Sequence, residues 1–426
     1  MERSSVSRRS FLKTSAVAAG TVIVANAGVN KVLGAAVGSD KLRIGLLGCG
    51  KRGSGAINDC LSSAENLEVT ALGDMFVDSA KHLLGGLKQK WGDKCKVTEE
   101  KCFGGFDAYK KVIEADVDVV LMCVPPGFRP LHLKAAVEAG KHVFIEKPVA
   151  VDPVGVRSVI ASAKLAAEKK LGIVAGTQRR HQKRYVEAMK RINEGAIGDI
   201  TAMQVYWIGD YGYYPAVMKK PEWSEMEWQI RNWNYFTWLS GDHIVEQHVH
   251  NLDIAHWAMK GPPIKAIALG GRQQRTGPEF GHIYDHFSVE FEYPNGVKVS
   301  SYCRQNAKTS NRISESVIGT KGFSNCHGFI TGENKWEFNG DDPNPYVQEH
   351  KDLIDSIRSG NPLNEGQRIA ESTLMGILGR MSAYTGREIS WDWALKASKL
   401  DLTPAKYEFG PNPVDGVAIP GETPLI

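Results

Sequence analysis

The sequence lacks the features that would mark a thiolate metal protein or a nucleic-acid-binding protein. Its seven cysteines form no Cys-x-x-Cys pair, which argues against zinc and redox motifs of that kind. The 52 basic and 48 acidic residues leave a net charge of only +4, and no basic stripe alternates with aromatic residues, so nucleic acid is not an expected partner. With 426 residues and 42% hydrophobic content, the chain is long enough for two domains.

The N-terminus carries a pattern typical of an export signal. Residues 7–13 read SRRSFLK, and an apolar run of small residues follows from Thr14 to Val29. Twin arginines before such a run are typical of twin-arginine export. The run is shorter than the roughly 20 residues that a spanning helix needs. We therefore expect residues 1–36 to be a signal peptide, cleaved after Ala27 or Ala36, and the product to be periplasmic or secreted without a stable membrane span.

A glycine-rich turn near the start of the mature chain predicts a dinucleotide site. An apolar strand pattern, LRIGLLG, runs into the spacing Gly-x-Gly-x-x-Gly, and a helical pattern follows. In that context the glycines let backbone amides and a helix N-terminus approach a pyrophosphate. The cofactor-binding residues expected in this turn are Gly48, Gly50, Lys51, Arg52 and Gly53.

The next strand pattern indicates which dinucleotide is preferred. It reads LEVTALGD and ends at Asp74, where an acidic side chain would accept hydrogen bonds from the adenosine ribose. Met75, Phe76 and Val77 follow, and none of them carries the positive charge that a 2′-phosphate would need. The sequence therefore favours NAD over NADP.

Helix and strand patterns then alternate up to about residue 150, which predicts a parallel sheet with helices on both faces. One strand ends at Pro125 and the next at Glu146-Lys147-Pro148, so both ends would lie at the carboxyl edge of the sheet, where a nicotinamide would sit. A lysine at such a strand end can donate to a substrate hydroxyl and stabilise a developing alkoxide. The alternative is a solvated loop lysine.

Residues 240–257, SGDHIVEQHVHNLDIAHW, concentrate four histidines in a stretch that has the apolar periodicity of one helix. On one helix His243 and His250 would be two turns apart, too far to bind a single ion. Glu246 and His250 would be at i and i+4, where a carboxylate can orient an imidazole that moves a proton. An ordinary helix surface and a metal site remain as alternatives from geometry alone.

The residues around Glu146-Lys147-Pro148, preceded by AGKHV at 139–143, resemble the signature of the Gfo/Idh/MocA oxidoreductase family. The likeness continues through GIVAGTQRRH at 172–181 and covers nearly all of residues 41–395. It implies an α/β fold with a Rossmann domain, residues 41–178, followed by an α+β domain with a large, mostly antiparallel open sheet, residues 179–400. Residues 401–426 would form an extended C-terminal arm. A homodimer or homotetramer is expected.

The resemblance also implies the catalytic set of a sugar or polyol dehydrogenase. Lys147 and His250 match the family's lysine and histidine, while Glu246 stands where the family has an aspartate. His250 would take the hydroxyl proton, and Lys147 would stabilise the oxygen as hydride passes to NAD. In this interpretation no metal is needed. Further cofactor contacts are expected from Pro125, Glu146, Lys147 and Gln178.

The expected substrate is a sugar, glycoside or polyol. Residues 206–238 are dense in Trp and Tyr, which can stack on sugar rings but equally often fill a core. The candidate substrate-binding residues are Arg179, His181, Tyr185, Arg231, Trp233 and His243. Export implies that NAD is bound beforehand and held through turnover. The alternative function is an NAD-dependent glycoside hydrolase that oxidises C3, eliminates the aglycone, adds water and reduces again, although the enzymes of that kind lack the Glu-Lys-Pro triplet.

Overall fold

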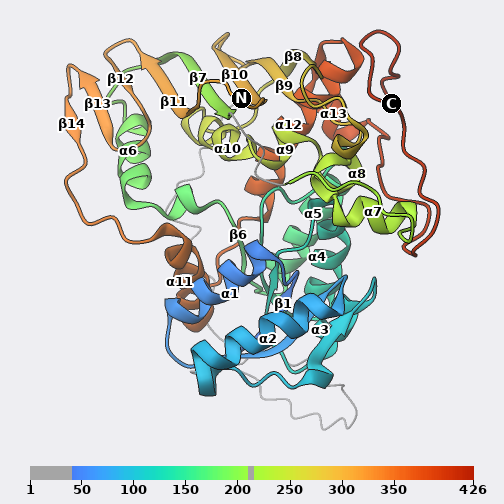
Figure 1. Cartoon of the computed structure of the whole chain (residues 1–426). Coiled ribbons are helices and arrows are strands. Elements are labelled where there is room, and N and C mark those ends of the chain that lie inside the picture. Colours follow the sequence, from blue (N-terminus) through green and yellow to red (C-terminus); the bar gives the residue numbers. More distant parts are fainter. Residues whose placement is uncertain (1–40, 210–214) are drawn as a thin grey trace, which may run out of the picture. The chain divides into compact units, whose positions relative to one another are not determined.

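The computed structural model describes residues 41–209 and 215–426, and two β-sheets organise them (Figure 1). The expected signal peptide at residues 1–36 lies outside the described residues. A six-stranded sheet comes first in the chain, and a nine-stranded sheet follows. The predicted fold class is confirmed.

The first sheet is parallel throughout, with the order β3-β2-β1-β4-β5-β6. Every residue of β4 and β5 is buried, because helices cover both faces of a parallel sheet. Its strands are β1 (Leu42–Leu47), β2 (Leu67–Asp74), β3 (Cys102–Gly104), β4 (Val119–Met122), β5 (His142–Ile145) and β6 (Ile173–Ala175). The connecting helices are α1 (Lys51–Ser63), α2 (Val77–Trp91), α3 (Ala108–Glu114), α4 (Arg129–Glu138) and α5 (Pro153–Glu168).

The second sheet is mixed but mostly antiparallel, with the order β14-β13-β12-β11-β7-β10-β9-β8-β15. Only β7 and β10 pair in parallel. A turn at Pro294-Asn295-Gly296 joins β9 and β10 as a hairpin, and Gly296 adopts a φ of 80°. Its strands are β7 (Ile200–Gly209), β8 (Lys265–Gly271), β9 (His286–Glu292), β10 (Lys298–Gln305), β11 (Arg312–Gly319), β12 (Gly322–Ser324), β13 (Phe329–Gly332), β14 (Trp336–Glu337) and β15 (Ile389–Ser390).

One late helix joins the core of the first domain. α11 packs against α1, and its Leu353 and Ile354 share a buried cluster with Ile44 of β1. The dinucleotide-binding domain is therefore completed by residues far beyond position 178. The helices of this half of the chain are α6 (Lys183–Asn193), α7 (Glu225–Arg231), α8 (Thr237–Ser240), α9 (His243–Glu246), α10 (Val249–Ala258), α11 (Pro345–Arg358), α12 (Gly366–Thr385) and α13 (Trp391–Lys396).

The prediction of one continuous helix over the histidine-rich stretch is wrong. α8 ends at Gly241, which is left-handed with a φ of 78°, and a second break at Gln247 and His248 separates α9 from α10. At this break His248 N donates to His243 O, five residues back, and His250 N donates to Gln247 O, three residues back. The regular i to i−4 ladder is thus lost between Glu246 and His250.

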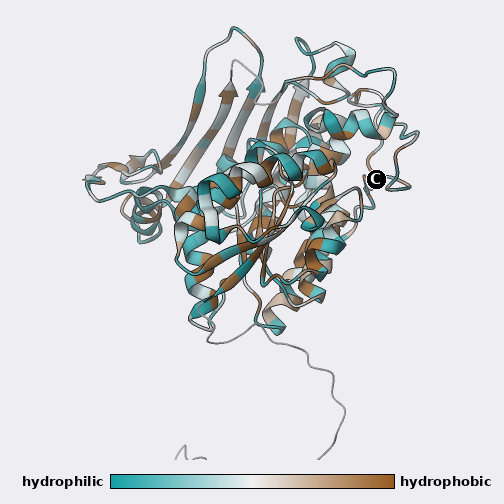
Figure 2. Cartoon of the chain, turned by 60° about the horizontal axis from the view of Figure 1, so that its bottom comes forward, coloured by the Kyte–Doolittle hydropathy of each residue, from teal (hydrophilic) through white to brown (hydrophobic). Residues whose placement is uncertain are grey.

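The distribution of hydropathy agrees with this layering. The strands of the six-stranded sheet are largely hydrophobic, and the helices that cover it show hydrophilic residues on their outer sides (Figure 2). Within residues 41–209 and 215–426, no helix is both long enough and apolar enough to cross a bilayer.

Candidate active site

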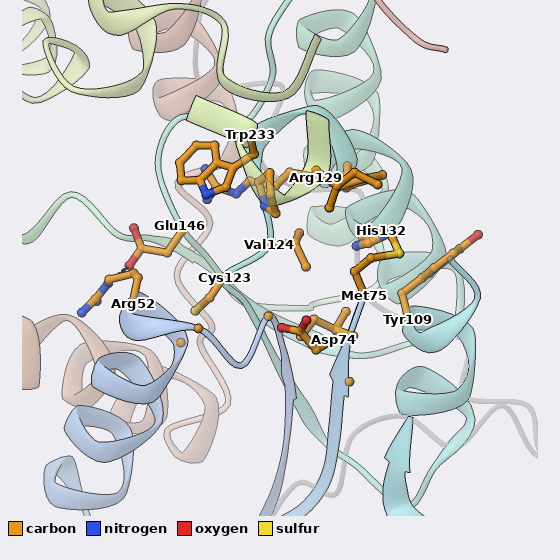
Figure 3. A pocket seen from close by; sticks show the side chains of 18 of the residues that line it. Arg52, Asp74, Met75, Tyr109, Cys123, Val124, Arg129, His132, Glu146 and Trp233 are labelled. Carbon is orange, nitrogen blue, oxygen red and sulfur yellow. Dashed lines mark hydrogen bonds and ion pairs between the residues drawn. The ribbon is translucent and has the colours of Figure 1, made fainter. Parts of the chain in front are cut away.

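A cavity of about 960 Å³ opens at the carboxyl edge of the six-stranded sheet. Its floor comes from the ends of β1, β2, β4 and β5, and its roof comes from the second domain, including Trp233 (Figure 3). The position is the one at which open parallel sheets bind ligands, outside the carboxyl ends of the strands. The cavity is large enough for both a dinucleotide and a small substrate.

The glycine-rich turn forms one end of the cavity, and its geometry requires glycine. A Cβ at Gly48, whose φ is 89°, would lie 2.6 Å from the carbonyl carbon of Cys123, and a Cβ at Gly53 would lie 1.7 Å from the Gly48 oxygen. Gly50 has no atom within 4 Å of its Cβ position and begins α1 without a side-chain cap. The first turn of α1 therefore offers free amides without an acidic side chain, which suits a pyrophosphate.

Asp74 lies at the end of β2, directly beside this turn. Its carboxylate accepts hydrogen bonds from Cys49 N at 2.7 Å and from Phe76 N at 2.9 Å. Burial raises the pKa of Asp74, and these two hydrogen bonds oppose the rise. Each carboxylate oxygen keeps a second lone pair, so a pair of ribose hydroxyls can be accepted. The turn and Asp74 together fit a dinucleotide.

Lys147 is buried where the two domains meet. Its Nζ donates to the backbone oxygen of Glu246 at 2.5 Å and to the Glu246 carboxylate Oε1 at 3.1 Å. Both side chains line the cavity and are almost fully enclosed. The expected orientation of His250 by Glu246 is not found, because the break in the helix turns Glu246 toward Lys147 instead. Glu246 balances the buried ammonium charge.

His250 lies at the first turn of α10 and faces the same cavity. Its ring stacks on Trp207 of β7, with centroids 5.6 Å apart. Nδ1 is buried without a hydrogen-bond partner, which leaves Nε2 as the ring nitrogen open to the cavity. Burial, followed by the charges of Lys147 and Arg179, holds the pKa of His250 well below its usual range. His250 is therefore neutral at pH 7 and able to accept a proton.

The remaining predicted cofactor residues also border the cavity. Arg52 forms a short ion pair with Glu146 and donates to Glu349 at 3.3 Å. Gly176 leaves space for the Glu146 carboxylate, because a Cβ there would lie 2.6 Å from Oε2. Gln178 Nε2 donates to the hydroxyl of Tyr346 at 3.2 Å. Lys51, Pro125 and Gln178 line the cavity as well.

Of the six predicted substrate-binding residues, the structure places only Arg231 and Trp233 in the cavity wall. Arg179 pairs with Glu315 of β11, and Tyr185 donates to the same carboxylate at 3.1 Å. His243 is buried in α9, where burial and nearby positive charge lower its pKa to about 3. Arg179, Tyr185 and His243 therefore do not line the cavity. The polar atoms of Arg179 and Tyr185 pair with Glu315, and His243 is enclosed by the core.

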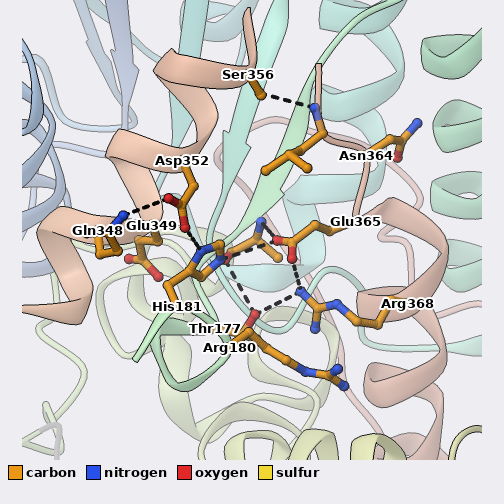
Figure 4. Close-up of polar contacts among 12 residues, drawn as sticks. Thr177, Arg180, His181, Gln348, Glu349, Asp352, Ser356, Asn364, Glu365 and Arg368 are labelled. Carbon is orange, nitrogen blue, oxygen red and sulfur yellow. Dashed lines mark hydrogen bonds and ion pairs between the residues drawn. The ribbon is translucent and has the colours of Figure 1, made fainter. Parts of the chain in front are cut away.

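His181 does not line the cavity and belongs to a polar network with residues of α11 and with Glu365 (Figure 4). Its Nδ1 lies 2.6 Å from Asp352, and its Nε2 lies 3.7 Å from Glu365. Burial lowers the pKa of His181, but the two carboxylates outweigh it and raise the pKa to about 10. His181 is therefore a charged structural residue that ties η4 (Gln178–His181) to α11.

Several cavity residues were not anticipated from the sequence. Arg129 forms a short hydrogen bond to the backbone oxygen of Pro148, next to Lys147. Trp207 lay within the aromatic-rich segment, but nothing in the sequence distinguished it from a core residue. Tyr407 comes from the C-terminal arm, which carries no periodic pattern. The unanticipated lining residues include Tyr109, Arg129, His132, Trp207, Gln247, Tyr346 and Tyr407.

Potential metal ligands do not gather in the described part of the chain. No group of three or more His, Cys, Asp or Glu side chains is placed to hold an ion there. The seven cysteines are free, and six of them are buried.

The fold and the cavity define a two-domain, dinucleotide-binding oxidoreductase. Residues 42–174 match the family described as an oxidoreductase family with an NAD-binding Rossmann fold, and residues 185–324 match the GFO/IDH/MocA C-terminal domain. The chain belongs to the Gfo/Idh/MocA oxidoreductase family and is an enzyme of the sugar and inositol dehydrogenase kind.

Relatives extend over most of the chain at low identity. Inositol 2-dehydrogenase 3 of Saccharopolyspora erythraea is 25% identical over 281 residues, which are 66% of this chain and 72% of that protein. Inositol 2-dehydrogenase of Gluconacetobacter diazotrophicus is 24% identical over 333 residues, which cover 75% of this chain and 87% of that protein. The aldose-aldose oxidoreductase of Caulobacter crescentus, solved with glycerol, shares the fold with a TM-score of 0.62 at 19% identity, covering 82% of this chain and 99% of that one.

Proposed function

We propose that this enzyme transfers hydride between a ring or chain hydroxyl of a sugar, glycoside or polyol and a tightly bound NAD. One observation supports the proposal above all: Lys147 and His250, from different domains, border the same cavity as the glycine-rich turn and Asp74. The substrate class is supported by relatives whose names specify inositol and aldose as substrates. The aromatic roof residue Trp233 suits the apolar face of such a ring.

The protein's own groups supply the acid-base part of the reaction. Bound NAD would supply the hydride acceptor. His250, neutral and open to the cavity at Nε2, takes the proton of the substrate hydroxyl. The ammonium of Lys147 donates to the same oxygen and stabilises the negative charge that develops there. Glu246 is a positioning residue, because it holds Lys147 in place across the domain boundary.

The choice of NAD over NADP is supported by Asp74, whose negative charge would repel a 2′-phosphate. The structure places one of the predicted substrate-binding residues, Arg231, near this end of the cavity. The Arg231 guanidinium lies 3.8 Å from the centre of the Phe76 ring, two residues from Asp74. Arg231 is however paired with Glu227 at 2.8 Å, so its charge is balanced locally.

The decisive experiment combines purified wild-type enzyme with a panel of inositols, aldoses and glycosides and follows the absorbance of reduced nicotinamide. We expect Lys147→Met and His250→Gln to lower kcat by about 10²- to 10⁴-fold, the usual range for a lost general acid or base. Matched controls are Lys164→Met and His82→Gln, which change exposed helical residues of the same types. Both should retain wild-type rates.

Binding and chemistry are separated by measuring NADH affinity of the same variants by fluorescence. The affinity should change far less than kcat, because neither substitution alters the glycine-rich turn. Equal rates in His250→Gln and wild type would contradict the proposal. Release of aglycone from a chromogenic glycoside without net reduction of NAD would favour the glycoside hydrolase instead.

We further propose that the enzyme is exported in the folded state with its dinucleotide bound. The proposal is supported by the paired arginines at positions 8 and 9 and the apolar run that follows. A chain with Arg8→Lys and Arg9→Lys should accumulate inside the cell at full length, while the wild-type chain should be processed and recovered outside the cytoplasm. Equal distribution of both chains would refute export by this route.

A further inference from the structure

The C-terminal arm, residues 401–426, reaches the cavity from outside both sheets. Its Tyr407 lines the cavity together with Phe76, Phe106 and Phe128 of the first domain. The ring centre of Tyr407 lies 6.1 Å from the ring centre of Phe106 and 5.8 Å from that of Phe128. The arm thus supplies part of the wall of the site and does not merely lie on the surface.

A second aromatic residue of the arm, Phe409, packs behind this wall and is 48% exposed. Phe409 stacks on Phe76 with ring centres 6.3 Å apart and an interplanar angle of 10°, and it lies 5.3 Å from Phe106. Phe76 follows Asp74 by two residues, and Asp74 marks the ribose of the adenosine half of a dinucleotide. The aromatic cluster of Phe76, Phe106, Tyr407 and Phe409 therefore lies at the adenosine end of the cavity.

The arm is fixed on both sides of this cluster. Before it, Leu402 N donates to the Asp152 carboxylate at 2.8 Å. After it, Asn412 Nδ2 donates to Oε1 of the buried Gln229 at 2.7 Å, and Gln229 Nε2 donates to the Asn412 backbone oxygen at 2.7 Å. Met226 N donates to Gly410 O at 3.1 Å. In Figure 1 the dark red end of the chain accordingly runs past α7.

We propose that residues 402–412 form a closed strap over the adenosine end, so that the dinucleotide leaves only when the strap detaches. The inference rests on the proposed function and adds a mechanism for holding the cofactor. An adenine at this end would meet Tyr407 of the strap together with Phe76 and Phe106 of the first domain, and aromatic rings of this kind favour stacking with a purine. The strap can detach only if the Phe76–Phe409 and Phe106–Tyr407 contacts break. The free energy needed to break these contacts makes release of the dinucleotide slow.

The test is the dissociation rate of NADH, measured by displacement with excess NAD and followed by nicotinamide fluorescence. Tyr407→Ala and Phe409→Ala should each accelerate release by up to about tenfold, the range that corresponds to one aromatic pair, and the double variant should accelerate it further. Val414→Ala is the matched control, because Val414 is on the same arm, is exposed and lines neither the cavity nor the aromatic cluster. Its release rate should equal that of the wild type.

A second measurement does not depend on a substitution that disturbs folding. Hydrogen exchange of residues 405–412 should slow when NADH binds to the wild-type protein. Unchanged release rates in Phe409→Ala and Tyr407→Ala, together with unchanged exchange in this segment, would overturn the strap while leaving the proposed function intact. Failure of the wild-type protein to bind any dinucleotide would instead overturn the proposed function.

Discussion

At the scale of single residues, the site depends on charges that meet across the two domains. Lys147 comes from the end of β5 and Glu246 from the end of α9, and each compensates the charge of the other in a buried position. The position of Lys147 was predictable, because the end of a parallel strand is defined by local sequence. Its partner was not predictable, since the pairing depends on a break in a helix that apolar periodicity does not reveal.

The same distinction applies to His181. A histidine that follows a strand end looks like a pocket residue in the sequence, and its partners Asp352 and Glu365 lie far along the chain. Only the tertiary structure shows that they enclose it. By contrast, Gly48, Gly53 and Asp74 serve roles fixed by one local turn, and their placement followed directly from spacing.

The charge of His181 gives a prediction for stability. Because its folded pKa is raised to about 10 from 6.5, the stabilisation is complete below pH 6.5 and is lost as the pH rises through 10. His181→Asn should lower the free energy of unfolding by about 3 kcal/mol at pH 6, the range for breaking a buried ion pair. Denaturant titration measures the free energy of unfolding of the variant and of the wild type at pH 6 and again above pH 10.

The difference in the free energy of unfolding between His181→Asn and the wild type should be smaller above pH 10 than at pH 6. His82→Asn, which alters an exposed histidine of α2, should leave the unfolding free energy within about 0.5 kcal/mol of wild type. A difference for His181→Asn that stays constant between the two pH values would contradict the assignment of a charged imidazole.

Asp74 gives a prediction for cofactor choice. Asp74→Asn removes the negative charge and keeps an acceptor oxygen for only one of the two amides, because Cys49 N and Phe76 N bond to different carboxylate oxygens. The ratio of NADPH to NADH dissociation constants should therefore fall by about tenfold, or about 1.4 kcal/mol. Fluorescence titration with each nucleotide measures the ratio, with Asp93→Asn as an exposed control. Tighter binding of NADPH than NADH by the wild type would show that Arg231 dominates over Asp74.

At the scale of elements, the sequence indicated well where the strands are. It indicated less well which helices and strands pack together. The alternation of helix and strand up to residue 150 follows from local patterns, and the six-stranded sheet is parallel as expected. The sequence of α11 also has a clear helical pattern. That pattern does not indicate whether the helix covers the first sheet or the second. That choice is made by the complementary surfaces of α1 and β1, which the sequence presents only as separate apolar positions.

The placement of α11 predicts that the dinucleotide-binding domain needs it for stability. Leu353 of α11 is 1% exposed and belongs to the same buried cluster as Leu42 and Ile44. Leu353→Ala should lower the free energy of unfolding by about 3 kcal/mol through lost burial and a cavity. Leu363→Ala is the control, because Leu363 is 42% exposed, and it should change the value by less than about 0.5 kcal/mol. Equal losses for the two variants in denaturant unfolding would place α11 outside the core of this domain.

At the scale of the whole molecule, the nine-stranded sheet has one covered face and one open face. α10 and α12 pack against the inner face, where Phe287, Val289 and Phe291 are buried. The alternate residues of the strands point outward. On this outer face Tyr206 and Tyr302 stack at 5.4 Å, and Leu269 of β8 is 77% exposed. Charged residues such as Glu290 and Lys298 lie on the same face, so the exposed apolar residues are surrounded by polar ones, a composition found at protein–protein interfaces.

We therefore propose that the outer face of the nine-stranded sheet joins copies of this chain into a dimer or tetramer. Light scattering of the wild-type protein should give two or four times the chain mass. Leu269→Asp, which places a charge at the most exposed apolar position of this face, should shift the mass toward that of the monomer, because burying an unpaired charge is costly. Leu363→Asp, which introduces the same charge at an exposed leucine outside this sheet, should leave the mass unchanged. A monomeric wild type would refute association through this face, and an unchanged oligomer in Leu269→Asp would place the interface elsewhere.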